Sequence, residues 1–320
     1  MRAESDPASS DTLGVLRARG TDVVQFLQGQ LSNDMSLLSP ARSLLAGYHN
    51  PQGRTIALLQ LVQIADGDLV MILPRELIAP LIGRLSKFIL RAKVTLADES
   101  ASWRVTPAVT ATDAAAGVTA APVAHALPAA LGAVTRAGET LVVCVGEAPP
   151  RWLLVAPSAA PAAPPSGCAA AGPQDWRRMQ IAAGVPQVYA ATSEQFVAQM
   201  LNLDALGAIA FDKGCYTGQE VIARAHYRGR VKRRTQRFVT RGPCSLNTGD
   251  TGALADGRVF RVVEAVQTAD GRCEFLAVAP LIVAAQASPE HARAAAPGTL
   301  VVEAQILPLP YVLDKPEGLD

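Results

Sequence analysis

Apolar residues recur at helical spacing in three stretches of the chain. The clearest follows Pro74, where the apolar positions from Leu77 to Ile89 are spaced i, i+1, i+4, i+5, i+8, i+11 and i+12 and therefore share one helix face. A second helix is predicted after Thr21-Asp22, which offers an N-cap ahead of apolar residues on one face. A third is predicted from Asp175 to Ala183, where glycine and then proline end the pattern.

Strand patterns alternate with turn signals near both ends of the chain. A short strand is predicted from Leu13 to Arg19, and Ala46 to Leu61 has the pattern of a hairpin that turns at Asn50-Pro51-Gln52-Gly53. After Arg230, short apolar runs separated by glycine- and aspartate-containing turns predict a small β-barrel or sandwich. The strands predicted in that last part are Thr235–Thr240, Val259–Val266, Glu274–Val278 and Val301–Ile306.

Composition narrows the class of protein. A chain of 320 residues is long for one domain and predicts two or three. Hydrophobic residues make up 49% and aromatic residues 5%, so the core is predicted to be aliphatic. The net charge of +1 argues against a polyanion partner bound by overall charge, so any nucleic-acid surface would be a local patch. The polar N-terminus lacks the apolar segment of a secretory signal, and no apolar run is long enough to span a membrane, so we expect a soluble cytoplasmic protein without a membrane partner.

The five cysteines do not form a recognisable framework. They stand at positions 144, 168, 215, 244 and 273, with no CxxC pair and no Cys/His cluster at metal-ligand spacing. We therefore expect neither a disulfide framework nor a structural zinc site. Ala156 to Pro173 is a low-complexity Pro/Ala stretch, predicted to be a mobile loop or linker. No dinucleotide fingerprint, P-loop or GxSxG motif appears, which disfavours the cofactors that need them.

Candidate functional residues are most concentrated in the stretch from Phe211 to Arg234. Thr217 to Glu220 has the T-x-x-E form of a capping box, which predicts a helix beginning at about Thr217. Cys215 would then lie just before a helix N-terminus and two residues after Lys213. The partial positive charge of the helix N-terminus and the charge of the lysine both favour thiolate over thiol. A reactive thiol and a small buried hydrophobe are both compatible with this pattern.

A run of basic residues follows the cysteine. Between Val221 and Arg241 there are eight arginines and lysines and no acidic residue. Such a run is compatible with binding of phosphate, carboxylate tails or RNA. The alternative, which we favour for Lys232 to Arg234, is a solvated strand edge kept soluble by its charge.

A resemblance to a known family emerges at these residues. The chain reads KGCYTGQE from Lys213 to Glu220, preceded by ATSEQFVAQMLNLDALGAIAF and followed by ARAHYRGRVKR. These segments closely resemble the YgfZ family, folate-binding-fold proteins related to the T-protein (aminomethyltransferase) of the glycine cleavage system. FLQGQLSND, NPQGR and LPLPY extend the resemblance over nearly the whole chain. Ala198 stands where the family has proline.

The resemblance implies an architecture. The fold would be α+β, a three-lobed ring like the glycine cleavage T-protein, with two α+β (ferredoxin-like) lobes and a C-terminal β-barrel. Residues 12–230 would form the folate-binding-like region, with the low-complexity loop near 156–173 inside it. Residues 231–314 would form the barrel domain.

The resemblance also implies a function and its residues. The family is implicated in assembly or maintenance of iron–sulfur clusters, particularly in enzymes that thiomethylate tRNA, and it binds tetrahydrofolate or a derivative. Cys215, with Lys213, would carry the chemistry, and Cys215 is a candidate transient iron–sulfur ligand, although no metal ligand is certain. One cysteine cannot supply a four-thiolate cluster site by itself. The residues expected to bind the folate are Asn33, Asp34, Tyr216, Gln219 and Arg228.

Three functions follow, in order of preference. The first is a folate-binding accessory factor whose partners are folate and iron–sulfur client enzymes. The second is a tetrahydrofolate-dependent aminomethyl or one-carbon transferase, although we do not expect a glycine-cleavage transferase because the T-protein motif lacks the cysteine. The third is tRNA binding through the basic run, disfavoured because the net charge is near zero and no RNA-binding motif appears.

Overall fold

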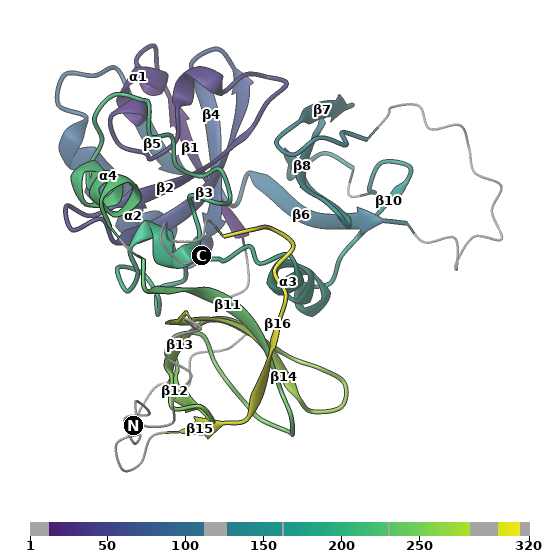
Figure 1. Cartoon of the computed structure of the whole chain (residues 1–320). Helices are drawn as coiled ribbons and strands as arrows, with labels where there is room; N and C mark the ends of the chain where they lie inside the picture. Colours follow the sequence, from purple (N-terminus) through teal and green to yellow (C-terminus); the bar gives the residue numbers. More distant parts are fainter. Residues whose placement is uncertain (1–12, 112–126, 162, 230, 282–299, 314–320) are drawn as a thin grey trace, which may run out of the picture. The chain divides into compact units, whose positions relative to one another are not determined.

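The computed structural model describes residues 13–111, 127–161, 163–229, 231–281 and 300–313, and these form two compact units that interleave along the chain (Figure 1). The first unit comprises residues up to Tyr48, Ala57–Trp176 and Asp212–Tyr216, and the second comprises His49–Ile56, Arg177–Phe211 and the chain from Thr217 onward. The division predicted from the sequence, 12–230 and 231–314, is a different partition and stays a prediction. Residues 12, 230 and 314 lie outside the described residues.

The first sheet has five strands in the order β2-β3-β4-β1-β5. The predicted first strand and the hairpin are confirmed. These strands are β1 (Leu13–Arg19), β2 (Leu44–His49), β3 (Thr55–Ala65), β4 (Asp68–Pro74) and β5 (Thr95–Asp98). The chain between β1 and β2 forms the short helix α1 (Val23–Gln28) and the 3-10 turn η1 (Met35–Leu37).

The long helix predicted after Pro74 is present in a broken form. It divides into η2 (Arg75–Leu77), α2 (Ile78–Leu85) and η3 (Ser86–Phe88). Pro80 accounts for the first break, because it has no amide proton to donate and is tolerated only in the first turn of an α-helix. The α-helical part therefore begins at Ile78.

The second sheet of the first unit has the order β10-β6-β9-β8-β7. Strands were predicted at Leu141–Val145 and Trp152–Val155, which correspond to β8 and β9, whereas the other three strands of this sheet were not predicted. Of these three, β6 lies in an alanine-rich stretch and β10 lies in the Pro/Ala stretch that we expected to be a mobile loop or linker. The short β10 pairs with β6 in antiparallel register, so local composition was overridden by pairing with a distant strand. The five strands are β6 (Trp103–Thr110), β7 (Val134–Ala137), β8 (Thr140–Glu147), β9 (Pro150–Pro157) and β10 (Cys168–Ala170).

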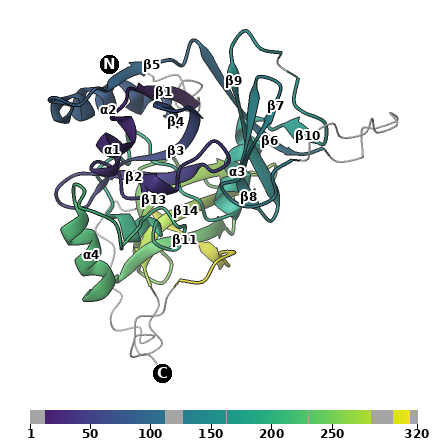
Figure 2. The same cartoon turned by 90° about the horizontal axis from the view of Figure 1, so that it is seen from above.

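Alternation along β8 and β9 gives this second sheet two apolar faces. Val143 and Val155 belong to a core shared with Val15 and Val70 of the first sheet, so the two sheets pack together within the first unit (Figure 2). The other face carries Val142, Cys144, Trp152, Leu154 and Cys168. These core residues are aliphatic for the most part, as the composition predicted.

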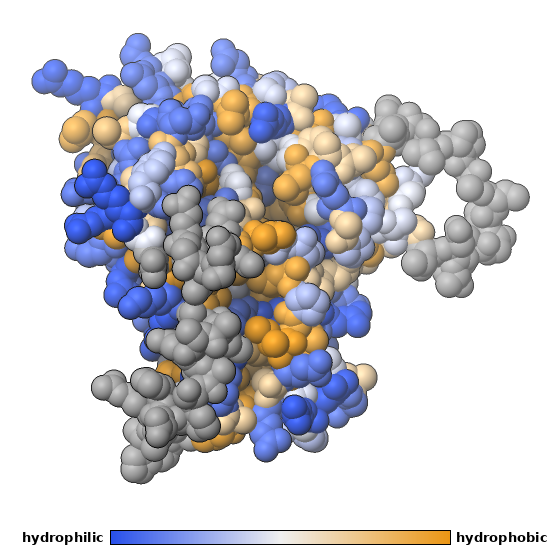
Figure 3. All heavy atoms as spheres, viewed as in Figure 1, coloured by the Kyte–Doolittle hydropathy of each residue, from blue (hydrophilic) through white to orange (hydrophobic). Residues whose placement is uncertain are grey.

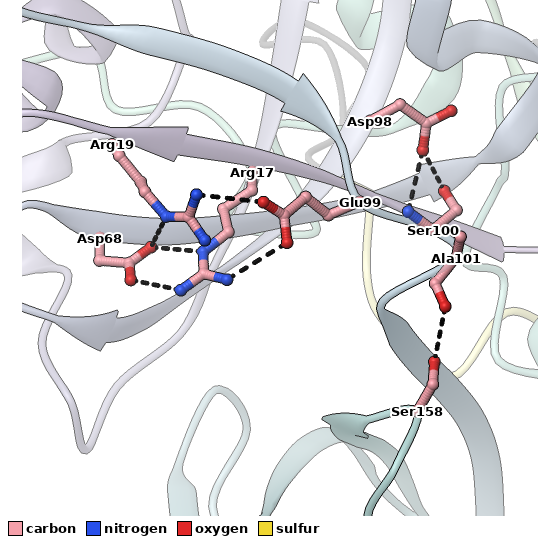
Figure 4. Close-up of polar contacts among 8 residues, drawn as sticks. All are labelled: Arg17, Arg19, Asp68, Asp98, Glu99, Ser100, Ala101 and Ser158. Atoms are coloured by element: carbon pink, nitrogen blue, oxygen red, sulfur yellow. Dashed lines mark hydrogen bonds and ion pairs between the residues drawn. The ribbon is translucent and has the colours of Figure 1, made fainter.

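An ion-pair network ties together strands of the first sheet (Figure 4). Arg17 of β1 donates from Nε and Nη2 to the two oxygens of Asp68, at 2.7 and 2.6 Å. Arg19 lies 3.1 Å from Glu99, which also accepts from Arg17 at 3.3 Å. Arg19 also lies 3.6 Å from Asp68, so each guanidinium faces both carboxylates and the opposite charges neutralise one another.

The second unit contains the six-stranded C-terminal sheet, in the order β15-β12-β13-β14-β11-β16. The sheet is barrel-like, as predicted, and its core includes Phe238, Phe260 and Phe275. The strands are β11 (Arg233–Thr240), β12 (Thr251–Leu254), β13 (Val259–Gln267), β14 (Cys273–Pro280), β15 (Val301–Val302) and β16 (Ala304–Leu307).

Two helices belong to the connecting segments. The helix α3 (Pro173–Ala182) confirms the third helix predicted from the sequence, and α4 (Gln219–Tyr227) follows the KGCY segment. No helix among the described residues has both the length and the apolar character that crossing a membrane requires. On the face drawn in Figure 3, hydrophobic residues occur in small groups among hydrophilic ones.

Candidate functional site

The loop that carries Cys215 is fixed to the first unit by the ammonium group of Lys213. Its Nζ donates to three backbone carbonyls, those of Gln28 at 2.7 Å, Leu31 at 2.7 Å and Asn33 at 2.8 Å. An ammonium has three protons, so this set satisfies it completely. Burial lowers the pKa of Lys213 to about 8, and the negative charge of Asp34 opposes part of that shift.

Tyr216 is the second anchor of the same loop. Its side chain is buried, and its ring centroid lies 5.1 Å from the Nζ of Lys213, within the range of a cation–π contact. Burial raises the pKa of Tyr216 to about 12. Cys215, between the two anchors, is exposed. The loop therefore presents the thiol to solvent while the residues on either side hold the backbone in place.

Gly214 leaves the space beside the cysteine open. A Cβ atom built at Gly214 would meet nothing within 4 Å, so a ligand can approach the backbone beside the sulfur. Cys144, Cys168 and Cys273 are buried and Cys244 is half-buried, all as free thiols. Cys215 is the exposed member of the five.

Asn33 and Asp34 belong to the segment that accepts the lysine. The side chain of Asn33 donates to the Leu45 carbonyl at 2.8 Å and accepts from the Asp34 amide at 2.8 Å. The Oδ1 of Asp34 caps η1 by accepting from the Ser36 amide at 3.0 Å and also accepts from Gln28 Nε2 at 3.0 Å. The Ser36 amide is the main cause of the lowered pKa of Asp34, and the charge of Lys213 is a smaller one.

The helix after the cysteine does not begin as predicted. The capping box is wrong: α4 starts at Gln219, its N-cap is Gly218, and no side chain caps it. Gly218 has φ = 84°, and a Cβ there would lie 2.5 Å from the Asn50 carbonyl oxygen. The close approach of the hairpin turn, possible only for glycine, sets the helix start instead of the Thr217 hydroxyl. The first helical residue therefore follows Cys215 by four positions.

The structure brings only some of the predicted site residues into one network. Lys213, Tyr216, Asn33 and Asp34 belong to the first unit with Cys215. Gln219, the first residue of α4, and Arg228, its exposed C-terminal cap, belong to the second unit. The sequence did not predict that the backbone carbonyls of Gln28 and Leu31 are acceptors. Every residue has a backbone carbonyl, so residue type does not indicate which carbonyls bind a side chain.

Two further motif segments have structural roles in the second unit. Asn50 closes the hairpin turn by accepting from the amides of Gln52 and Arg54 at 3.1 and 3.0 Å, and its Nδ2 donates to Glu194 at 2.8 Å. The hydroxyl of Tyr311, from the LPLPY segment, donates to the Gly184 carbonyl at 2.6 Å. These motif residues hold the fold together.

The prediction that Lys232 to Arg234 form a solvated strand edge is wrong for Arg234. Its side chain is buried and makes a two-pronged ion pair with Asp204, at 2.9 and 2.8 Å. The physical reason is the strand order, in which β11 lies between β14 and β16 and is therefore interior to the sheet. The side chain of Arg234 therefore has a structural role and is not part of a solvated edge.

No metal centre is evident in the part of the chain that the structure describes. Within it, no group of three or more His, Cys, Asp or Glu side chains is arranged to hold a metal ion. Cys215 could contribute one thiolate to an iron–sulfur cluster, so this chain alone does not fit the ligand set of a complete cluster.

The fold defines the class of protein. A solved structure of the glycine cleavage system aminomethyltransferase T from Bartonella henselae superposes with a TM-score of 0.55 over 85% of this chain and 77% of that one. The sequence identity is 12%, so this likeness concerns the fold alone. The chain thus has a mixed α/β fold of the aminomethyltransferase T type.

Sequence relatives define the family. The tRNA-modifying protein YgfZ of Escherichia coli O157:H7 (strain EC4115 / EHEC) is 32% identical over 261 residues, 79% of this chain and 78% of the relative. The protein of the same name from Yersinia pseudotuberculosis serotype O:1b (strain IP 31758) is 31% identical over 313 residues, 95% and 92% of the two chains. No protein-family model matches. This chain belongs to the family of the tRNA-modifying protein YgfZ.

Proposed function

We propose that this protein is a cytoplasmic, folate-binding accessory factor that supports the assembly or maintenance of iron–sulfur clusters in client enzymes, including tRNA-thiomethylating enzymes, through Cys215. One observation carries the proposal: Cys215 is exposed on a loop whose flanking residues, Lys213 and Tyr216, are both anchored. A thiol that had only a packing role would be buried, as Cys144 and Cys273 are.

The cysteine acts with a partner in this proposal. A single thiolate binds one iron of a cluster, and the client enzyme supplies the other ligands during a transient, shared state. The saturated ammonium of Lys213 favours a positioning role for this residue over attraction of an anionic ligand, because its three donors are already used. The open space at Gly214 gives a client access to the sulfur.

Asp34 is the residue of this region best suited to bind the folate. Its carboxylate is half-buried and accepts hydrogen bonds from Ser36 and Gln28, so it lies at the surface as an acceptor that a ligand donor can also reach. A pterin ring carries amino and ring N–H groups, and a carboxylate can accept hydrogen bonds from them. Binding of tetrahydrofolate, followed by fluorescence, is expected to weaken in Asp34→Asn and to stay unchanged in Asp66→Asn, an exposed aspartate of the first unit.

The cysteine is tested by complementation. Cys215→Ser is expected to fold, to bind tetrahydrofolate like the parent protein, and to fail to restore thiomethylated tRNA nucleosides in a deletion strain. Cys244→Ser, which changes a half-buried cysteine of the second unit, is the matched control and is expected to complement. Full complementation by Cys215→Ser would disprove a role for the thiol.

A second candidate function rests on the fold. The likeness to aminomethyltransferase T favours a tetrahydrofolate-dependent one-carbon transferase, although a shared fold does not fix a reaction. Turnover of tetrahydrofolate with an aminomethyl donor would support this candidate. Binding without turnover would leave the accessory role as the better explanation.

A further inference from the structure

Three arginines line one small pocket of the second unit. The pocket has a volume of about 230 Å³, and Arg54, Arg233 and Arg261 lie in its wall with Gln195 and Val278. Arg54 ends the hairpin turn, and its backbone forms an isolated antiparallel bridge with Val197. All of these residues belong to the second unit, so the pocket is complete within it.

The register of the C-terminal sheet places two of the arginines on one face. Arg261 of β13 stands directly opposite Val278 of β14, and Val278 stands opposite Thr235 of β11. Arg233 precedes Thr235 by two residues and therefore points to the same side of the sheet. The two guanidinium groups thus flank Val278 from neighbouring strands.

The three guanidinium groups have neutral partners. Arg54 donates to the carbonyls of Gln195 and Glu194, at 2.9 and 3.3 Å, and Arg233 donates to the Val259 carbonyl at 2.9 Å. Arg261 donates to the side-chain oxygen of Gln195. The residues lining the pocket, all of them described, include no carboxylate.

The charges on the pocket wall influence one another. The pKa of Arg233 is lowered, first by burial and then by the positive charge of Arg261. The carboxylate of Glu194, whose backbone lies beside Arg54, is hydrogen-bonded to the side chain of Asn50. The wall therefore carries three positive charges, and no salt bridge joins them to a carboxylate among the described residues, which is the arrangement of an anion site.

We propose that this arginine pocket binds a phosphate group. Guanidinium forks match the oxygens of phosphate two at a time, and three of them from separate segments suit a tetrahedral oxyanion better than a planar carboxylate. A volume of about 230 Å³ is smaller than the roughly 300–1,000 Å³ of pockets that enclose a whole organic ligand. The occupant is therefore a free phosphate or the phosphate of a larger molecule. This inference involves neither Cys215 nor the folate, so it stands or falls independently of the proposed function.

Inorganic phosphate, titrated by calorimetry, is the direct probe. Arg54→Gln, Arg233→Gln and Arg261→Gln are each expected to weaken binding at least about tenfold, because each removes a charge-assisted hydrogen bond. The matched control is Arg272→Gln, which removes the same charge from an exposed ion pair with Asp270 in the same unit. Glutarate, a dicarboxylate, is expected to bind more weakly than phosphate.

A second arm distinguishes the sources of the phosphate. If the phosphate belongs to RNA, an unmodified tRNA transcript is expected to lose affinity in the same three variants, with a shallower dependence on salt. If tRNA affinity is the same in all variants while phosphate binding is lost, the ligand is a small phosphorylated molecule. Either result supports the site.

The proposal would be overturned if phosphate failed to bind the parent protein, or bound the pocket variants and Arg272→Gln equally well. Thermal unfolding of each variant identifies any that fail to fold. Arg54 is exposed, and its side chain donates to the backbone carbonyls of Glu194 and Gln195, so Arg54→Gln remains an informative variant even if Arg233→Gln is destabilised.

Discussion

The Lys213 loop and the arginine pocket both concentrate positive charge, but they differ in what surrounds it. The ammonium group of Lys213 donates its three hydrogen bonds to three backbone carbonyls, so it has no further donor for a ligand. Within the described part of the chain, the three arginines of the pocket donate to a few neutral oxygens, which use a minority of their N–H donors. The first arrangement holds a loop, whereas the second is suited to bind a ligand.

Strand β11 shows the same contrast between two adjacent residues. Arg233 faces the pocket, while Arg234 points to the other side of the strand and pairs with Asp204. A run of basic residues therefore does not act as one surface, because alternation along a strand sends neighbours to different surroundings.

The largest effect is expected at the buried pair. Arg234→Met should lower the free energy of unfolding by about 3–5 kcal/mol, because it leaves the largely buried Asp204 carboxylate without its partner. Urea denaturation measures this change. Arg272→Met, which breaks an exposed pair, should leave the free energy of unfolding close to that of the parent protein.

A double variant sharpens this first prediction. Arg234→Met combined with Asp204→Leu should recover part of the lost stability, since no unpaired charge remains. If Arg234→Met were as stable as Arg272→Met, the ion pair of Arg234 would not stabilise the fold.

A smaller effect is expected at the loop. Lys213→Met removes three charge-assisted hydrogen bonds and should lower the free energy of unfolding by about 2–4 kcal/mol. It should also speed proteolysis near Cys215, which mass spectrometry can locate. Lys232→Met, an exposed lysine, is the control. Equal behaviour of the two variants would contradict an anchoring role for Lys213.

The smallest effect concerns a buried acid whose charge is only partly compensated. Glu264 accepts from the Tyr189 hydroxyl at 3.1 Å and lies 3.6 Å from Arg177, yet burial raises its pKa from 4.5 to about 7. The folded state therefore binds more protons than the unfolded state between these values. Stability should fall as the pH rises from about 4.5 to about 7.

Replacement of the acid tests this sign. Glu264→Gln should flatten the pH dependence in that window by about 1–3 kcal/mol, measured as the free energy of unfolding at several pH values. Glu303→Gln, on the exposed surface of the same unit, should leave the profile unchanged. A profile that Glu264→Gln does not alter would assign the pH dependence to other groups.

Local pattern predicted much of the secondary structure. The hairpin around Asn50 was visible because its turn residues are specific, and the C-terminal strands were visible because they alternate between turns. The strand β10 was missed because Cys168–Ala170 has no strand pattern of its own and exists through its pairing with β6. The start of α4 was misplaced because contact between Gly218 and the hairpin turn overrode a plausible capping box.

The sequence by itself determined the family and the barrel-like C-terminal sheet, since these depend on residue type and spacing, and it singled out the segment around Cys215 as the candidate site. Only the tertiary structure decided that Lys213 is an anchor, that Arg234 is buried and that Arg54 joins Arg233 and Arg261 at one pocket. The physical reason is that the partners of a charged side chain come from distant segments. Backbone carbonyls and strand register set those partners, and neither is written in the local sequence.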